Sequence, residues 1–484
     1  MEWTRKKRYL PYNEWDADTL LHLQSQASRS NYQMRYHLRP ISGLVNDPNG
    51  FSYYNGEYHV FYQSYPFGAV HGLKSWVHFK SHDLVHWERQ GLAIEPSFKG
   101  DSHGAYSGSA KQIGDKLFIM YTGNHRSKDW IRTPYQISAW MNKDGVVSDK
   151  EILFKNPSHI TEHFRDPQII EKDGTYYAIL GAQDEQNKKG HIDVWKSQNL
   201  KDWEEIGFLN FTDEDMGYMI ECPNLVQVDD KWVLIFCPQG LNKAVADYQN
   251  IYPNMYVIAD DIDFENAKMI NPSKLQNLDE GFDVYATQAF NAPNGKAYEI
   301  SWVGLPDITY PTDDENWANC LSQVKELSIK DGKLIQKPVK AIESIRKSEN
   351  KLTDKLIRNT TSGQYELKLT IAKNQSTTLH LAANKDLSES LILNIDTNDG
   401  KLVLDRSKGK KVAVDYGETR SCELNPNESV DLDIFIDHSL IEIFVNHGEH
   451  VLTGRFFTNP ENQKISFDKD IDFTGKFWEM ETIF

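Results

Sequence analysis

Three acidic side chains occupy a similar place in a repeated pattern of the sequence. Asp47, Asp166 and Glu221 each lie seven or eight residues before a turn that introduces a strand rich in aromatic and β-branched residues. If the repeats pack around a common axis, the three carboxylates converge at one end of it. Converging carboxylates suit glycoside hydrolysis, in which one carboxylate attacks the anomeric carbon while another protonates the departing oxygen.

The local sequence favours fixed positions for these acids. Pro48 and Pro167 directly follow two of them, and Pro223 comes two residues after Glu221. Proline fixes the backbone angle φ and removes a hydrogen-bond donor, which makes each segment rigid. A lone Asp-Pro is usually a solvated turn, whereas three acids at one repeat position favour a functional site.

Metal and cofactor chemistry is not indicated by the sequence. The acidic loops 212–217 and 311–316 lack the oxygen spacing of an EF-hand calcium site. His78, His82 and His86 run into a predicted turn, which does not favour a zinc site on a helix. Phosphate-binding loops and the HExxH zinc motif do not occur. We therefore expect neither a metal nor a cofactor.

A turn followed by a strand recurs about every 60 residues and defines the elements that must position the acids. Repeated β units that cannot bury both faces alone must stack around an axis. Five such units predict an all-β protein that begins with a five-bladed β-propeller; an irregular array of sandwiches is the alternative. The five signatures begin at Asn55, Gly114, Asp173, Asp229 and Asn294.

The composition and spacing of residue types along the sequence predict four segments. Residues 1–30 should form a helical segment that caps the propeller of residues 31–337, because the stretch from Asn13 has helical apolar spacing without Pro or Gly. Residues 338–355 are polar and read as a linker. Residues 356–484 carry short alternating strands, which predict a C-terminal β-sandwich. Its alternating strands are typical of a structural cover rather than of a sugar-binding module.

Composition narrows the class of partner. The chain has 484 residues and a formal net charge of −17, which disfavours nucleic acid as a partner. Four cysteines without a CxxC pair fit a reducing compartment. The chain contains neither the apolar run of a signal peptide nor that of a membrane span, so we expect a cytoplasmic protein without a membrane partner. Nothing in the sequence predicts an oligomeric state.

Several separated motifs together resemble glycoside hydrolase family 32, the invertases and fructan hydrolases, and within it the group of bacterial sucrose-6-phosphate hydrolases. The resemblance spans nearly the whole chain and implies a five-bladed propeller with a C-terminal β-sandwich. The motifs are NDPNG at 46–50, FYQ at 61–63, HGLKSW at 71–76, SGSA at 107–110, RDP at 165–167, ECP at 221–223 and DIFIDHSLIEIFVN at 433–446.

The resemblance implies a role for each acid. Asp47 would be the nucleophile, Glu221 the general acid/base and Asp166 the stabiliser of the transition state, with retention at the anomeric carbon. Retention requires the carboxyls of the nucleophile and the acid to lie about 5 to 5.5 Å apart, and the acid must be protonated at neutral pH. Motif positions that would contact the fructosyl unit or balance its acids are Asn46, Gln63, Trp76, Ser107 and Arg165.

The resemblance also implies a small sugar as substrate: sucrose 6-phosphate, sucrose or short fructo-oligosaccharides. A phosphorylated substrate needs a local basic pocket on this acidic protein. Candidates for that pocket are His71, Lys74, His103, Arg126 and Arg132. An intracellular invertase without phosphate preference, fructosyl transfer to another sugar, and a carbohydrate-binding propeller that has lost catalysis remain the alternatives.

Overall fold

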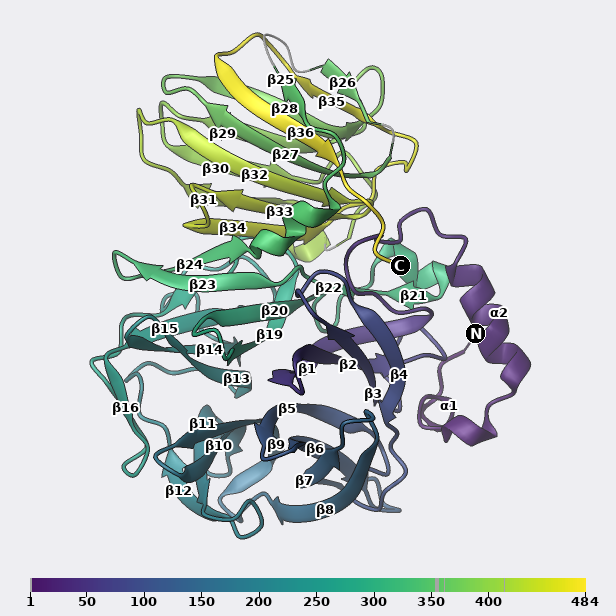
Figure 1. The fold of residues 1–484 in the computed structure, drawn as a ribbon, viewed down its shortest axis with the longest axis vertical. Coiled ribbons are helices and arrows are strands. Elements are labelled where there is room, and N and C mark those ends of the chain that lie inside the picture. The colour runs from purple at the N-terminus through teal and green to yellow at the C-terminus, as the bar shows by residue number, and fades with distance from the viewer. Residues whose placement is uncertain (1, 353–356, 361, 413) are drawn as a thin grey trace.

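The structure is a computed structural model that describes residues 2–352, 357–360, 362–412 and 414–484. Nearly all its regular elements are strands, as the sequence predicts. Figure 1 shows two regions: sheets arranged around an axis in the first two thirds of the chain, and a β-sandwich, coloured green to yellow, beyond them. None of the helices in the described residues is long and apolar enough to cross a membrane.

In the described residues of the first region, five antiparallel sheets follow one another along the chain. Each begins with a strand next to the axis and runs outward through hairpins. The sheets comprise β1 (Gly43–Tyr54), β2 (Glu57–Tyr65), β3 (Ser75–Ser81) and β4 (Glu88–Ile94); β5 (Ala105–Ile113), β6 (Lys116–Arg126), β7 (Arg132–Met141) and β8 (Val147–Lys155); β9 (Ile160–Lys172), β10 (Thr175–Asp184), β11 (Gly190–Ser197) and β12 (Glu204–Phe208); β13 (Met219–Val228), β14 (Lys231–Gln239), β15 (Met255–Ala259) and β18 (Gln276–Asn277); and β19 (Val284–Asn291), β20 (Ala297–Val303), β23 (Lys325–Lys330) and β24 (Lys333–Pro338).

Short elements complete this region. β21 (Trp317–Ala318) pairs in parallel with β1, and β22 (Cys320–Leu321) pairs with β20. β16 (Asp261–Asp263) and β17 (Lys268–Ile270) form a separate hairpin, and η2 (Pro311–Glu315) is a 3-10 helix. The pairing of β21 with β1 joins a late segment of the chain to the first sheet.

The first strands of the five sheets are tied into a closed ring by side chains. On each strand a polar side chain accepts a hydrogen bond from a backbone N–H of the next first strand, at 2.6 to 3.3 Å. These bonds satisfy backbone donors that face the axis and have no partner in their own sheet. The accepting side chains are Asn49, Ser109, Gln168, Asn224 and Gln288, and the last of them returns to β1.

Each first strand also carries a β-bulge at the same place. Two of its residues face a single residue of the second strand, which bends the strand and redirects its side chains. The bulges contain Asn46 and Asp47 on β1, Tyr106 and Ser107 on β5, Asp166 and Pro167 on β9, Cys222 and Pro223 on β13, and Ala286 and Thr287 on β19.

The bulges correct one step of the sequence argument. The three acids are not at one equivalent position: Asp47 is the second bulge residue of its strand, Asp166 is the first, and Glu221 is the residue before the bulge. Counting from the hairpin turns made Asp47 and Glu221 look equivalent, because a second irregularity of β1, between Asn49 and Ser52, lengthens the segment between its bulge and its turn. The three acids therefore project from their strands at three successive positions relative to the bulge.

The N-terminal segment is helical in short pieces and lies beside the first sheet (Figure 1). It contains α1 (Arg5–Arg8), η1 (Tyr12–Glu14) and α2 (Ala17–Ala27). Asp16 caps α2 by accepting from the backbone N–H of Asp18 at 3.1 Å. The Trp15 ring stacks on Phe67 with centroids 4.4 Å apart, which anchors the segment to the propeller.

The C-terminal region packs two six-stranded sheets around an apolar core. The predicted linker contains η3 (Lys340–Ile345), and its predicted end at residue 355 lies outside the described residues. One sheet comprises β25 (Asn350–Leu352), β36 (Phe473–Glu479), β27 (Gln364–Ile371), β32 (Val430–Asp437), β33 (Leu440–Val445) and β34 (His450–Arg455); the other comprises β26 (Ile357–Asn359), β35 (Lys464–Phe467), β28 (Ser376–Ala383), β29 (Leu391–Asp396), β30 (Lys401–Asp405) and β31 (Thr419–Glu423), with η4 (Val414–Tyr416) before the last strand.

A buried polar contact joins the sandwich to the first region. His37 lies between two acids of the sandwich, with Nδ1 2.9 Å from Asp437 and Nε2 2.9 Å from Glu442. Asp283, which precedes β19, forms an ion pair with Arg406 at 2.9 Å. Asp283 thus belongs to the junction between the two regions.

Candidate active site

The bulges bring Asp47, Asp166 and Glu221 together at one end of the ring. The Cys222 thiol lies 3.7 Å from an Asp47 oxygen and 3.5 Å from an Asp166 oxygen, which places it between the two. Glu221 immediately precedes Cys222, and its charge acts on both aspartates. The convergence predicted from the repeats is therefore present, although the acids occupy different positions on their strands.

Asp47 is surrounded by uncharged donors. Asn46 donates to one of its oxygens at 3.0 Å, and Gln63 donates to the other at 3.2 Å. The Ser107 hydroxyl also donates to the second oxygen. Burial raises the pKa of Asp47, the hydrogen bond from Ser107 opposes that shift, and the charge of Glu221 adds to it. These donors orient a carboxylate that is costly to ionise.

Asp166 is held by strained backbone. Its φ of 64° lies in the left-handed region that L-residues rarely adopt, and the first bulge residues of the next two sheets, Cys222 and Ala286, both have φ of 50°. One oxygen of Asp166 accepts from the backbone N–H of Cys222 at 2.9 Å. Burial raises the pKa of Asp166; Arg165 opposes this shift, whereas Glu221 and Asp47 increase it.

Glu221 receives donors on both oxygens. Arg165 donates from Nε at 2.9 Å and from Nη2 at 2.6 Å to one oxygen, and Gln239 and Tyr285 each donate to the other at 2.6 Å. The side chains of Arg165 and Glu221 keep 13% and 17% of their surface exposed, so a ligand can reach them. The four contacts hold the Glu221 carboxylate in one orientation.

The predicted fructosyl contacts fall into two groups. Asn46, Gln63 and Ser107 lie against Asp47, and Gln63 also donates to the Ser107 hydroxyl. Trp76 is fully buried and donates from its indole N–H to the Tyr106 carbonyl at 2.9 Å. The structure thus places three polar candidates in the site and places Trp76 in the core that supports the bulge of β5.

The structure places the five candidates for a phosphate pocket in different surroundings. Lys74 is buried and donates to Asn46 at 2.6 Å, next to Asp47, and burial lowers its pKa to about 7. His71 is exposed, with its ring 6.3 Å from that of Trp302. His103 accepts from the backbone N–H of Arg126 at 3.3 Å, and Arg126 pairs across the strands with Arg132.

Three polar residues around the acids were missed by the sequence argument: Cys222, Gln239 and Tyr285. Cys222 and Tyr285 lie at the bulges of β13 and β19, so the strand alignment that located the acids could also have located them. Gln239 ends β14 and had no signal, because its role depends on the opposing strand.

Two groups in the described part of the chain bring three possible metal ligands within 4.8 Å of one another. In Asp47, Asp166 and Cys222, burial raises the pKa of the thiol well above its usual value, so the thiol remains protonated. The other group is Glu280, Cys422 and His450, in which the imidazole is already bonded to the carboxylate at 2.7 Å. Both arrangements are explained by hydrogen bonding.

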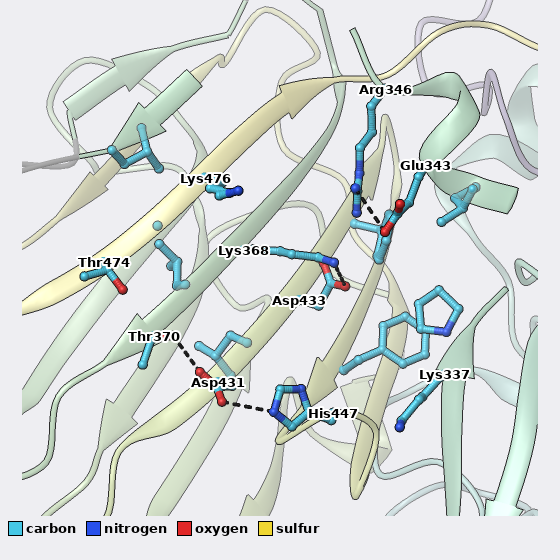
Figure 2. A pocket seen from close by; sticks show the side chains of 18 of the residues that line it. Lys337, Glu343, Arg346, Lys368, Thr370, Asp431, Asp433, His447, Thr474 and Lys476 are labelled. Carbon is cyan, nitrogen blue, oxygen red and sulfur yellow. Dashed lines mark hydrogen bonds and ion pairs between the residues drawn. The ribbon is translucent and has the colours of Figure 1, made fainter. Parts of the chain in front are cut away.

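A separate pocket of about 790 Å³ lies between η3 and the sandwich (Figure 2). Its basic side chains include several in ion pairs: Lys368 lies 3.2 Å from Asp433, Arg346 lies 3.2 Å from Glu343, and His447 is paired with Asp431. These pairs offset the positive charge of the pocket wall. The pocket is lined by residues other than the three acids.

Comparison with family models identifies both regions. Residues 37–338 match the glycosyl hydrolases family 32 N-terminal domain, and residues 333–479 match the glycosyl hydrolases family 32 C terminal. The chain belongs to glycosyl hydrolase family 32, which confirms the resemblance drawn from the motifs and the assignment as a glycoside hydrolase.

Relatives of known name extend the match to the full length. The chain is 47% identical to a sucrose-6-phosphate hydrolase of Pediococcus pentosaceus, over 99% of this chain and 97% of that protein. Its fold matches the solved structure of sucrose-6-phosphate hydrolase from Lactobacillus gasseri with a TM-score of 0.98, 58% identity and full coverage of both chains. A β-fructofuranosidase of Bombyx mori matches with a TM-score of 0.84 at 28% identity, over 96% of this chain and 97% of that one.

Proposed function

We propose that this protein hydrolyses sucrose 6-phosphate to fructose and glucose 6-phosphate. The observation that carries the proposal is the intact set of three converging acids in a chain that matches sucrose-6-phosphate hydrolases over its whole length. A binding protein without catalysis would have no use for buried carboxylates whose ionisation is costly. The acids therefore favour an enzyme over the carbohydrate-binding alternative.

The proposed mechanism assigns one step to each acid. Asp47 attacks the anomeric carbon of the fructosyl unit, and the bond from this carbon to the glucosyl oxygen breaks as Glu221 gives that oxygen a proton. In this step Glu221 acts as the general acid. Glu221 then removes a proton from water, which attacks the same carbon and releases Asp47. Two displacements at one carbon retain its configuration.

The neighbouring side chains fit these steps. Asn46, Gln63 and Ser107 hold Asp47 by hydrogen bonds and leave its carboxylate aimed at the site. Asp166 is suited to accept hydrogen bonds from fructosyl hydroxyls as positive charge develops on the sugar ring. Arg165 reduces the repulsion between the acids through its ion pair with Glu221 at 2.6 Å.

The fold proposal is a five-bladed propeller over residues 31–337, capped by residues 1–30, linked by 338–355 and followed by a sandwich over 356–484. The ring of hydrogen bonds between the first strands supports one blade for each sheet. A cytoplasmic location is expected because a sugar phosphorylated during uptake is found inside the cell. The four cysteines, all buried and unpaired, fit a reducing compartment.

The decisive measurement is kcat/KM for sucrose 6-phosphate beside sucrose and short fructo-oligosaccharides. A hydrogen-bonded contact to a charged group contributes about 1.5 to 3 kcal/mol, so we expect at least a tenfold preference for the phosphorylated substrate. Equal values for the first two substrates would instead indicate an invertase. Faster reaction with fructo-oligosaccharides would indicate a fructan hydrolase.

A further inference from the structure

Three arginines beside the candidate site share an incomplete environment. The Nε atoms of Arg8, Arg126 and Arg132 are buried and have no hydrogen-bond partner. Among the described residues, no carboxylate forms an ion pair with any of these guanidinium groups. The three side chains are partly exposed, and Nη1 of Arg126 donates to the Trp130 carbonyl at 3.0 Å. A cation that is partly removed from water normally acquires an acidic partner. On a chain with a net charge of −17, such a group of unpaired cations requires an explanation.

The three arginines surround the hydroxyl of Tyr9, and we name them the arginine cluster. Arg126 and Arg132 face each other across β6 and β7, and Arg126 lies 4.9 Å from the Trp130 ring centroid. The Tyr9 ring lies 5.2 Å from the same tryptophan. Burial raises the pKa of Tyr9 to about 12, and the charges of Arg126, Arg132 and Arg8 oppose that shift, so all three act on one hydroxyl.

The N-terminal segment is anchored where it contributes to this cluster. The Arg8 carbonyl accepts from the backbone N–H of Leu73 at 2.8 Å. The Tyr12 hydroxyl donates to the Leu73 carbonyl at 2.8 Å and to the Ser75 hydroxyl at 2.9 Å. Arg8 and Tyr9 are therefore fixed by contacts with the HGLKSW motif, and the segment does more than cover the propeller.

Arg132 connects the cluster to the surroundings of Glu221. Arg165, which pairs with Glu221, lies 3.2 Å from the His163 ring, and the charge of Arg132 acts on both Arg165 and His163. Glu221 is the proposed donor of the proton to the departing sugar. A phosphate on that sugar therefore needs cations in the neighbourhood of Glu221.

We propose that Arg8, Arg126 and Arg132 bind the phosphate dianion of the departing sugar, with the N-terminal segment forming one wall of the pocket. The inference rests on the proposed function and assigns its phosphate contacts. Guanidinium groups bind phosphate through paired hydrogen bonds, and three unpaired ones can neutralise a dianion. Lys74 does not fit this role, because its ammonium group is bonded to Asn46 beside Asp47.

The test compares Arg8→Gln with the wild type on two substrates. The ratio of kcat/KM for sucrose 6-phosphate to that for sucrose should fall at least tenfold in Arg8→Gln, because the lost contact is to a charged group. Arg132→Gln should give the same result. Arg8→Lys keeps the charge without the planar fork and should recover part of the ratio. Arg29→Gln, at an exposed arginine of the same N-terminal region, should leave the ratio unchanged.

Product inhibition gives a second readout that a purely structural role would not move. Inhibition by glucose 6-phosphate should weaken at least tenfold in Arg8→Gln, while inhibition by fructose stays at the wild-type level. An unchanged substrate ratio in both glutamine variants, or equal losses on both substrates, would overturn the phosphate assignment. A wild type with no preference for sucrose 6-phosphate would overturn the proposed function itself and the pocket with it.

Discussion

Two clusters of acids in this protein contain the same residue types, but the pKa values of their aspartates are shifted in opposite directions. The axial cluster is Asp47, Asp166 and Glu221; the junction cluster is Asp437 and Glu442 with His37 between them. In the axial cluster, burial and mutual repulsion raise the pKa of both aspartates. In the junction cluster, burial opposes ionisation, but the hydrogen bond and charge of His37 hold the pKa of Asp437 below its usual value.

The difference lies in the balance of charge. His37 bonds both acids of the junction, each at 2.9 Å, and burial of the imidazole is outweighed by these acids, which raise its pKa to about 9. Two backbone N–H groups, from Arg35 and Tyr36, also donate to Asp437. The axial acids instead share Arg165, which bonds only Glu221 among them. One cluster stabilises the fold, and the other holds poorly compensated charge where a reaction can use it.

Asp47→Asn is expected to produce the largest effect. Loss of the proposed nucleophile should lower kcat/KM by about 10⁴-fold or more. The free energy of unfolding should stay equal or rise, because the change removes a buried charge that its surroundings compensate poorly. Steady-state kinetics and urea unfolding at pH 7.5 measure the two quantities. A loss of stability together with activity would place Asp47 in the same class as the junction acids.

His37→Gln should have the reverse profile. Removing the shared cation leaves two buried acids without compensation, which costs about 3 to 5 kcal/mol of unfolding free energy. The change lies in the contact between the two regions, away from the proposed chemistry. Urea unfolding and kcat/KM at 20 °C should show a clear loss of stability with activity retained in the folded fraction. A variant as stable as the wild type would mean that the junction cluster contributes little.

Both clusters should make the folded state less stable as pH rises, but over different pH ranges. The folded-state pKa of His37 is raised to about 9, so its contribution to stability is complete below about 6.5, the usual histidine value, and is lost as pH rises through 9. The folded-state pKa of Asp166 is raised as well. For an acid this means that ionisation destabilises the folded state, so the cost grows as pH rises through that pKa.

Unfolding measured from pH 5 to 9.5 tests this contrast. The stability of the wild type relative to His37→Gln should shrink as pH rises above about 6.5. The stability of Asp166→Asn relative to the wild type should grow with pH and reach at least about 1 kcal/mol, the equivalent of a shift near one pKa unit. The Asp166 comparison should change mainly below about pH 7 and the His37 comparison mainly between about 6.5 and 9. Changes of both comparisons over one and the same pH range would contradict the distinction between the clusters.

The sequence predicted the elements of the active site better than their register. Hairpin turns and aromatic strands identified the repeats because turn residues and alternation are local signals. The offsets among Asp47, Asp166 and Glu221 escaped because they depend on where each acid lies relative to the bulge of its strand. Register of this kind is fixed by packing between strands that are distant in sequence.

The same reason explains which partners were missed. Gln239 and Tyr285 reach Glu221 from a neighbouring strand and a neighbouring sheet. No pattern marks Gln239, whereas Tyr285 could be found only by aligning β19 with the other first strands. Arg8 belongs to a segment predicted only as a helical cap, and its position becomes apparent through its backbone contact with Leu73. The sequence shows which residues have side chains that could take part in chemistry. Which of these side chains converge is decided only in the folded chain.

Tyr285→Phe is expected to have the smallest effect and divides the axial cluster further. The change removes one donor, at 2.6 Å, from the oxygen of Glu221 that Arg165 does not bond, and leaves the packing of the ring. Loss of a hydrogen bond to a charged group costs about 1.5 to 3 kcal/mol, so kcat/KM should fall at least about tenfold. We propose that Glu221 gives its proton in the first displacement and acts as the base in the second. Losing a donor that favours its ionised form should therefore slow the first displacement less than the second. Pre-steady-state kinetics with a substrate that carries a good leaving group, which needs little protonation, should therefore show a larger burst of leaving-group release in Tyr285→Phe. An unchanged burst would assign Tyr285 to holding Glu221 in position rather than to balancing its two protonation states.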